Sequence, residues 1–199
     1  MSRTRLPRLR SLCVFCGSSP GSDPGHRAAA ARLGRALAAD GVRLVYGGGH
    51  LGMMGALAEA VMGAGGRVVG IIPEHLTRIE KAYMEITELH VVDSMHTRKR
   101  MMFDMADAFA VLPGGMGTMD ETFEILTWKQ LRLHNKPIVI VNQNGYWQPW
   151  LDLAAHIIGN GFAHADTSRL YSVADDVDQV LAKARDGIEM AAGGKPQLF

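Results

Sequence analysis

Residues 113–121, with the sequence PGGMGTMDE, combine closely spaced glycines with a hydroxyl group and two carboxylates. The segment lies between an apolar run at 108–112 and an amphipathic run at 119–131, which predicts a turn from a strand into a helix. Glycine lets the backbone approach a ligand closely, and the free amides and dipole at a helix N-terminus favour an anion. A phosphate group is the expected ligand. The candidate phosphate-binding residues are Gly114, Gly115, Gly117 and Thr118.

Glu121 lies about one helical turn beyond this anion site and has two interpretations. Thr118 and Glu121 have the spacing of a capping box, in which both side chains bond the first amides of a helix and serve only its stability. A carboxylate beside a bound sugar phosphate can instead stabilise positive charge on the sugar or deprotonate a water molecule, by analogy with glycosidases. The spacing alone favours neither interpretation.

Three consecutive cations at 98–100 follow the start of a helix predicted at 95–106. Asp93 or Ser94 is the expected N-cap of this helix. Positive charge near a helix N-terminus is unfavourable, and such local conflicts gather at functional sites. Arg98 is therefore a candidate functional residue, with a solvated charged face as the structural alternative.

A second glycine-rich turn follows a strand predicted at 42–46. Gly47, Gly49 and Gly52 match the GxGxxG fingerprint of dinucleotide-binding folds, and Glu74 lies about 20 residues further on. This pattern predicts, as an alternative, an NAD-binding oxidoreductase. The match is weak because it falls on the second strand and helix rather than the first, and because other turns on the same edge are also rich in glycine.

Predicted strands and helices alternate along the whole chain. We expect an α/β fold with a doubly wound, Rossmann-like parallel sheet and helices on both faces, in a single domain. Such sheets bind ligands at the carboxyl ends of their strands, so Arg98 and Glu121 are expected to reach the same crevice. Strands are expected at 12–16, 42–46, 67–72, 86–92, 107–112, 138–142 and 171–173, and helices at 25–40, up to 63, and at 95–106, 118–133, 147–160 and 175–190.

The chain has 199 residues, a formal net charge of +1 and 47% hydrophobic residues. We expect a disordered basic leader at 1–10, one nucleotide-binding catalytic domain at 11–190 and a flexible tail at 191–199. The balanced charge predicts no nucleic-acid partner. No apolar run has the length of a transmembrane helix, and the N-terminus lacks the apolar core of a signal peptide, so we expect no membrane partner and a cytoplasmic location.

The two cysteines, Cys13 and Cys16, lie three positions apart in the first predicted strand. Side chains three apart on a strand point to opposite faces, so these thiols are expected neither to pair nor to share a metal. The histidines form no pattern with metal-ligand spacing. We therefore expect no metal and no cofactor.

The sequence resembles the LOG family, the cytokinin-activating nucleoside 5′-monophosphate phosphoribohydrolases that are often labelled lysine decarboxylases. PGGMGTMDE at 113–121 is similar to the family motif PGGxGTxxE, and MHTRK at 95–99 is similar to MHxRK. The CGSS, GGGxxGxMG and IIPxxL segments also follow in the family's order. Met116 stands where the family commonly has an aromatic residue, and Arg132 stands where it often has glycine.

This resemblance implies hydrolysis of the N-glycosidic bond of AMP or of N6-substituted adenosine 5′-monophosphates, including cytokinin riboside 5′-monophosphates, with release of the base and ribose 5-phosphate. It implies a homodimer with Arg98 and Glu121 as the catalytic residues. The loop at 73–85 that carries Glu80 is either a substrate-contacting lid or a solvated connection. The substrate-binding positions implied by the resemblance are Ser18, Ser19, Gly49, Met54, Glu80, Met95 and Lys99.

Two other functions must be distinguished from this hydrolysis. Related folds carry a nucleotide or a pterin cofactor without chemistry, and the same arginine and carboxylate would then bind the ligand only. Lysine decarboxylation requires pyridoxal phosphate bound to a lysine, and none of the six lysines has an obvious position for it.

Overall fold

The computed structural model describes residues 8–193. Seven strands form one sheet in the order β4-β3-β2-β1-β5-β6-β7, and every neighbouring pair is parallel. The strands are β1 (Ser11–Phe15), β2 (Arg43–Tyr46), β3 (Val68–Pro73), β4 (Glu88–Val92), β5 (Ala108–Val111), β6 (Ile138–Val141) and β7 (Ser172–Ala174). The helices are α1 (Pro24–Ala39), α2 (Gly52–Gly63), α3 (Met95–Met105), α4 (Met116–Gln130), α5 (Gln148–Gly159) and α6 (Val180–Gly193).

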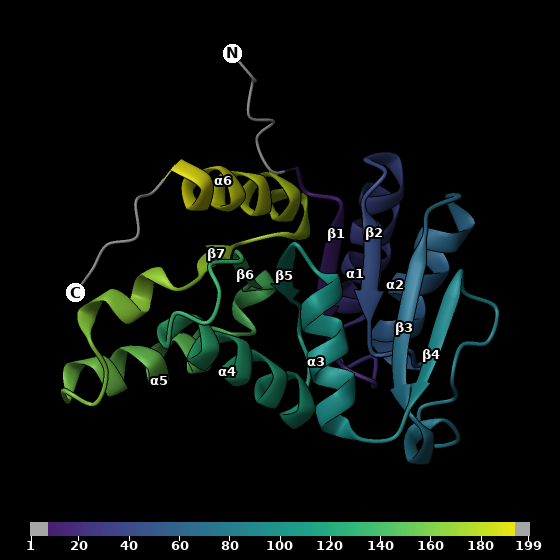
Figure 1. The fold of residues 1–199 in the computed structure, drawn as a ribbon, viewed down its shortest axis with the longest axis horizontal. Coiled ribbons are helices and arrows are strands. Elements are labelled where there is room, and N and C mark those ends of the chain that lie inside the picture. Colours follow the sequence, from purple (N-terminus) through teal and green to yellow (C-terminus); the bar gives the residue numbers. More distant parts are fainter. Residues whose placement is uncertain (1–7, 194–199) are drawn as a thin grey trace.

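The helices cover both faces of the sheet and bury two separate apolar cores. One core joins α1, α2 and α6 to one set of strand side chains, and the other joins α3, α4 and α5 to the alternate set. In Figure 1, α3 crosses in front of the sheet while α1 and α2 lie behind it. Cys16 lies in the first core and Cys13 in the second, which confirms that the two thiols point to opposite faces. The predicted doubly wound α/β fold is confirmed.

The winding direction of the sheet reverses between β1 and β5. The chain adds β2, β3 and β4 on one side of β1, then returns to place β5, β6 and β7 on the other. The turns that follow β1 and β5 touch at this switch point, where the amide of Gly17 donates to the carbonyl of Pro113 at 3.1 Å. Ligands of doubly wound sheets bind at such a crevice.

The N-terminus of α3 follows the sequence prediction, and that of α4 departs from it. Ser94 caps α3 by accepting a hydrogen bond from the amide of Thr97 at 3.2 Å, as predicted. The N-cap of α4 is Gly115, so Thr118 is the third residue of that helix and not its cap. The capping-box interpretation is therefore wrong, and Glu121 has no role at the first amides of α4.

Other predicted boundaries also change. Leu9 is buried at 3% exposure and the amide of Arg10 donates to Asp107 at 2.8 Å, so the predicted disordered leader at 1–10 is corrected at these two positions. The closing helix begins at Val180 instead of 175 and continues to Gly193, three residues into the predicted tail. Residues 1–7 and 194–199 lie outside the described part of the chain. Between residues 8 and 193, none of the helices has both the length and the apolar character needed to cross a membrane.

Helix α4 ends in a Schellman motif. The amide of Leu133 donates to the carbonyl of Trp128 at 2.9 Å, and the amide of Arg132 donates to that of Lys129 at 3.0 Å. This motif requires a left-handed residue, and Arg132 has a φ of 60°. The geometry explains why glycine is often found at this position in the family that the sequence resembles.

We predict that Gly34 is required for the close packing of α1 on α2. A Cβ atom at Gly34 would lie 2.6 Å from the carbonyl oxygen of Leu57 and 2.9 Å from the Cβ of Ala60. Overpacking of this kind costs about 1–3 kcal/mol, so Gly34→Ala should lower the free energy of unfolding in urea by that amount. The matched control is Gly63→Ala, because a Cβ there meets nothing within 4 Å. Equal stabilities of the two variants would contradict the packing argument.

Candidate active site

The N-terminus of α4 forms an exposed glycine-rich turn at the switch point, which is the candidate anion-binding turn. Gly115, Met116 and Gly117 are exposed, and the first amides of a helix have no partner within it. Thr118 is buried at 4% exposure behind them. A Cβ atom at Gly114 would approach the Thr118 hydroxyl to 2.2 Å, so the turn closes only with glycine at that position. The geometry suits a phosphate group, as the sequence predicted.

Arg98 projects from α3 into the centre of the site and is only 6% exposed. Its Nη2 atom donates to the carbonyl oxygen of Gly47 at 3.3 Å. The same atom lies 3.9 Å from a carboxylate oxygen of Glu80 and 3.9 Å from one of Glu121. A Cβ atom at Gly47 would lie 2.1 Å from Nη2, so this glycine makes room for the guanidinium group. The structure thus brings Arg98 and Glu121 together, as predicted.

Glu121 lies on the second turn of α4 and is 9% exposed. Burial raises the pKa of its carboxyl group to about 7, the Arg98 charge opposes this shift, and the Glu80 charge adds to it. A carboxyl group with such a pKa exchanges protons readily near neutral pH, which suits acid or base catalysis.

Glu80 reaches the site because its loop docks on the turn after β2. The amide of His50 donates to the carbonyl of Glu80 at 3.1 Å, and the amide of Tyr83 donates to that of Gly48 at 2.9 Å. The rings of His50 and Tyr83 stack with centroids 3.9 Å apart. The loop that follows β3 and the 3₁₀ turn Glu74–Leu76 is therefore bound to the site at Glu80, and is not simply a solvated connection.

Two buried polar atoms in this cluster have no hydrogen-bond partner among the described residues. They are Nε of Arg98 and Oε2 of Glu80. Buried polar groups are costly unless they are bonded, so their exceptions require an explanation. Both atoms belong to residues that surround the same crevice, where a polar ligand can satisfy them.

Two methionines border the arginine. The Sδ atom of Met95 lies 3.8 Å from Nη1 of Arg98. The Sδ atom of Met54 would lie 3.1 Å from a Cβ at Gly47, and its methyl group 2.8 Å from one at Gly49. These side chains give the site an apolar wall beside its charged cluster, and their contact with substrate stays a prediction.

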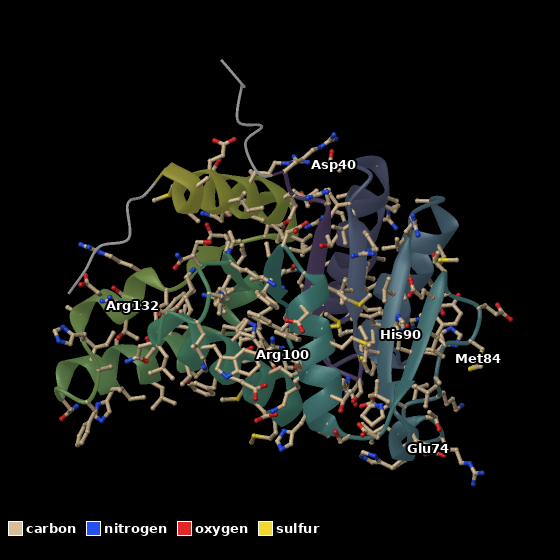
Figure 2. The ribbon with its side chains drawn as sticks, in the orientation of Figure 1. Asp40, Glu74, Met84, His90, Arg100 and Arg132 are labelled. Atoms are coloured by element: carbon tan, nitrogen blue, oxygen red, sulfur yellow. The ribbon has the colours of Figure 1, made fainter. Side chains whose placement is uncertain are left out.

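Ser18 and Ser19 are exposed on the turn after β1. Gly52 packs beneath this turn with a φ of 60°, and a Cβ there would lie 2.3 Å from the carbonyl oxygen of Ser18. Gly47 and Gly52 are thus explained by contacts within the protein. Glu74, the acidic residue of the dinucleotide fingerprint, is exposed just beyond the carboxyl end of β3 (Figure 2). The packing roles of Gly47 and Gly52 weaken the argument for NAD binding from this turn, because these glycines are needed without a dinucleotide.

Lys99 has protein partners in this structure. Its ammonium group lies 3.2 Å from Asp120 and 3.2 Å from Glu124, which ties α3 to α4. Burial lowers the pKa of Lys99, but the hydrogen bonds to these carboxylates outweigh that effect and raise it overall. A direct contact of Lys99 with substrate stays a prediction.

The sequence reasoning missed Gly47 as the hydrogen-bond acceptor of Arg98, and it missed Tyr146. The Tyr146 hydroxyl donates to the carbonyl of Gly114 at 2.6 Å, directly behind the anion-binding turn. Tyr146 could have been found from its position shortly after the sixth predicted strand, on the same edge as the glycine-rich turns.

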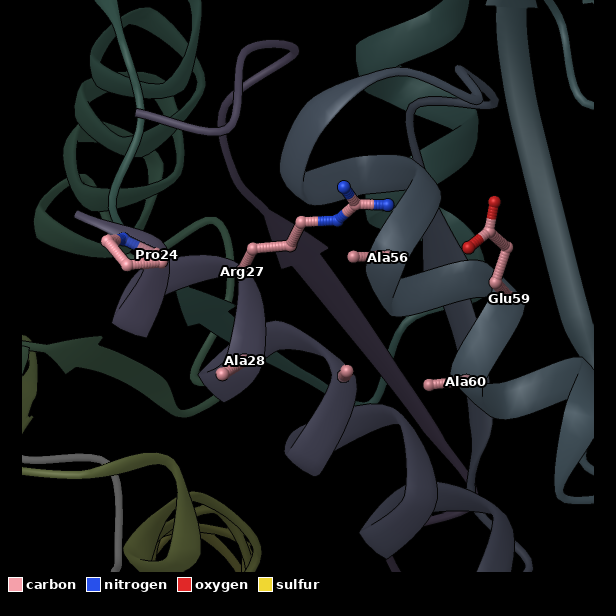
Figure 3. A pocket seen from close by; sticks show the side chains of 7 residues that line it. Pro24, Arg27, Ala28, Ala56, Glu59 and Ala60 are labelled. Carbon is pink, nitrogen blue, oxygen red and sulfur yellow. The ribbon is translucent and has the colours of Figure 1, made fainter. Parts of the chain in front are cut away.

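A shallow groove of about 480 Å³ lies elsewhere, between α1 and α2 (Figure 3). Arg27 and Glu59 border it, and alanines line much of the rest. None of its lining residues belongs to the cluster around Arg98. Within residues 8–193, no three His, Cys, Asp or Glu side chains are arranged to hold a metal ion.

The sheet and its switch-point cluster define a Rossmann-like α/β protein with a polar crevice at the carboxyl ends of its strands. The family model described as "Possible lysine decarboxylase" matches residues 54–184. The chain belongs to this family, which includes the LOG proteins. It is 46% identical to the cytokinin riboside 5′-monophosphate phosphoribohydrolase of Rhodococcoides fascians, over 93% of this chain and 94% of the relative. It is 38% identical to the cytokinin riboside 5′-monophosphate phosphoribohydrolase LOG of Oryza sativa subsp. japonica, over 92% of this chain and 75% of the relative.

Solved structures share the fold at lower identity. The molybdenum cofactor carrier protein of Chlamydomonas reinhardtii superposes with a TM-score of 0.67 at 21% identity, over 91% of this chain and 99% of that one. The molybdenum cofactor binding protein of Rippkaea orientalis superposes with a TM-score of 0.66 at 19% identity, over 88% and 94% of the two chains. These similarities establish the fold alone.

We predict that Glu121→Gln changes how stability depends on pH. The native pKa is about 7 against an ordinary value of 4.5, so the native state binds more protons between these values and loses stability as pH rises through them. The variant lacks this titration. Its free energy of unfolding relative to wild type should therefore rise between about pH 5 and about pH 8, by on the order of 1–3 kcal/mol, in urea titrations.

The control for this experiment is Glu124→Gln, which alters a carboxylate one turn further along α4 with a quarter of its side chain exposed. It should follow the wild-type pH dependence closely. A constant difference between Glu121→Gln and wild type across this range would show that Glu121 has an ordinary pKa.

Proposed function

We propose that this protein hydrolyses the N-glycosidic bond of a purine nucleoside 5′-monophosphate, releasing the free base and ribose 5-phosphate. The substrates are AMP or N6-substituted adenosine 5′-monophosphates, including cytokinin riboside 5′-monophosphates. One observation carries the proposal: the buried carboxyl group of Glu121 faces Arg98 one helical turn from an exposed helix N-terminus. The names of the relatives support the same reaction.

The 5′-phosphate binds at the N-terminus of α4. Backbone amides of the turn at Gly115 and Gly117 and the Thr118 hydroxyl are the donors, and the helix dipole adds to the attraction. Gly114 closes the turn behind the phosphate. This anchor places the ribose beside the second turn of α4, where Glu121 lies.

The reaction breaks the bond between the anomeric carbon of ribose and the base nitrogen. The bonding electron pair leaves with the base, positive charge develops on the sugar, and a water oxygen bonds to the anomeric carbon. Of the two protons of that water, one remains on the new hydroxyl and one reaches the departing base. The Glu121 carboxylate stabilises the sugar cation and accepts the proton from water, as carboxylates do in glycosidases.

Arg98 orients the two carboxylates and supplies a fixed positive charge beside the substrate. Its guanidinium group lies 3.9 Å from both Glu80 and Glu121, and its charge opposes the rise of the Glu121 pKa. Glu80 is available to the ribose hydroxyls through Oε2, which has no hydrogen-bond partner among the described residues. Met54 and Met95 contact the base, while Ser18, Ser19 and Gly49 border the substrate.

Lysine decarboxylation is disfavoured by the chemistry of the lysine in this cluster. A lysine that forms a Schiff base requires a lowered pKa. Hydrogen bonds to Asp120 and Glu124 have the opposite effect on Lys99. A role limited to carrying a ligand, as in the molybdenum cofactor carrier protein of Chlamydomonas reinhardtii, is the alternative that the experiment below distinguishes.

The functional unit in this proposal is a homodimer in the cytoplasm. Exposed apolar side chains on α4, Met116 at 84% and Phe123 at 39%, offer surface for a second copy. The unpaired Cys13 and Cys16 agree with a reducing compartment.

Gel filtration with light scattering should give twice the mass of the chain. In fractionated cells, the protein should be found together with cytoplasmic markers. A monomeric mass or a membrane-bound fraction would contradict this part of the proposal.

We predict that Glu121→Gln and Arg98→Ala each lower kcat for AMP by about 100- to 1,000-fold, because one preorganised electrostatic contact is removed in each. Chromatography of the incubated enzyme measures the released adenine. Glu124→Gln should retain most of the activity, because its carboxylate contacts Lys99 and not Arg98.

Adenosine serves as the substrate control, because it lacks the phosphate anchor and should release little base. Normal turnover by folded Glu121→Gln would overturn the catalytic assignment. Protection of the wild-type protein against heat by AMP without any release of base, from AMP or from its N6-isopentenyl derivative, would favour the carrier function.

A further inference from the structure

The turn between β6 and α5 reaches the anion-binding turn through Tyr146. The phenol hydroxyl donates a hydrogen bond of 2.6 Å to the carbonyl of Gly114, from a residue 32 positions later in the chain. Tyr146 is 40% exposed, so its position is not imposed by deep burial in either apolar core. The hydroxyl acts on the backbone of the turn and not on the charged cluster around Arg98.

The anion-binding turn has open space on its outer side, where a Cβ atom at Gly115 would meet no atom within 4 Å. The helix restrains the backbone from the Gly115 carbonyl onward, because that carbonyl accepts from the amide of Met119 at 3.1 Å. On the inner side, Gly114 packs against Thr118 and Gly17. Glycine residues have the widest conformational freedom, so the peptide group between Gly114 and Gly115 needs a specific contact to hold one orientation.

The hydrogen bond from Tyr146 fixes the direction of the Gly115 amide. The carbonyl of Gly114 and the amide of Gly115 belong to the same planar peptide group, and they point in opposite directions because that group is trans. When the carbonyl is held toward Tyr146, the Gly115 amide is held away from it. Gly115 is the N-cap of α4, so this amide is among the first donors available to an anion.

The turn that carries Tyr146 is itself anchored. The side-chain amide of Asn144 donates to Asp23 at 3.0 Å, and the side-chain oxygen of Asn142 accepts from the amide of Trp147 at 2.7 Å. The imidazole ring of His26 packs edge-on against the Tyr146 ring at 5.3 Å. The first turn of α1 and the end of β6 therefore hold the phenol ring in place.

We propose that Tyr146 is a positioning residue that orients the Gly115 amide toward the phosphate group of the substrate. This inference rests on the proposed phosphate site at α4. Loss of the hydroxyl weakens phosphate binding in the ground state and the transition state alike, so it raises KM and leaves kcat nearly unchanged.

The test is Tyr146→Phe, which removes the hydroxyl and retains the ring contacts with His26 and Trp147. The net contribution of one neutral hydrogen bond predicts an increase of about 3- to 10-fold in KM for AMP, with kcat within about twofold of wild type. Calorimetry should show the same increase in the Kd of ribose 5-phosphate. Tyr171→Phe is the matched control, since that ring packs on Trp150 in another part of the protein, and both constants should stay at wild-type values.

The two readouts separate this inference from the proposed function. If wild type releases base and Tyr146→Phe keeps the wild-type KM and Kd, the positioning role is overturned and the hydrolase function stands. If wild type releases no base but binds ribose 5-phosphate, a weaker Kd in Tyr146→Phe supports the positioning role alone, and an unchanged Kd overturns it. If wild type binds no ribose 5-phosphate, the phosphate site and the positioning role both fail. A fall in kcat with unchanged KM would assign Tyr146 to the chemical step instead.

Discussion

The buried positive charge of Arg98 is the constraint on which the rest of the site depends. A guanidinium group that is 6% exposed is stable only when several acceptors compensate for its lost hydration. Its partners come from separate parts of the chain: the Gly47 carbonyl after β2 accepts a hydrogen bond, and the carboxylates of Glu80 on the loop after β3 and Glu121 on α4 form ion pairs at 3.9 Å. The arginine therefore fixes the relative positions of these segments, and each requires the others to remain in place.

The same charge opposes the protonation of Glu121. Burial raises the pKa of Glu121 to about 7, and without Arg98 the carboxyl group would be protonated still more readily. The proposed reaction needs the ionised form of Glu121, and this ionised form costs folding stability. The packing around a functional site compensates for such a cost.

That support is visible in the contacts between α3 and α4 on one face of the sheet. Lys99 joins the helices at their N-terminal halves through Asp120 and Glu124. Near their C-terminal ends, Lys136 donates to the carbonyl of Phe103 at 2.6 Å and His134 to that of Ile125 at 2.8 Å. Burial lowers the pKa of His134, which keeps its ring neutral in this contact. The two helices that carry Arg98 and Glu121 are consequently held at both ends.

The sequence by itself determined the α/β architecture, the strand ends that carry the site, the opposite faces of Cys13 and Cys16, and a cap for α3 at Asp93 or Ser94. These features follow from hydrophobic periodicity and local backbone preference, which act over a few residues. The pairing of Arg98 with Glu121 was expected from the resemblance and from the common edge of the strands. Only the tertiary structure decided that α4 begins before Thr118, that Lys99 pairs with α4, and that Tyr146 supports the anion-binding turn. The last two depend on contacts between segments distant in the chain, whose separation no local pattern records.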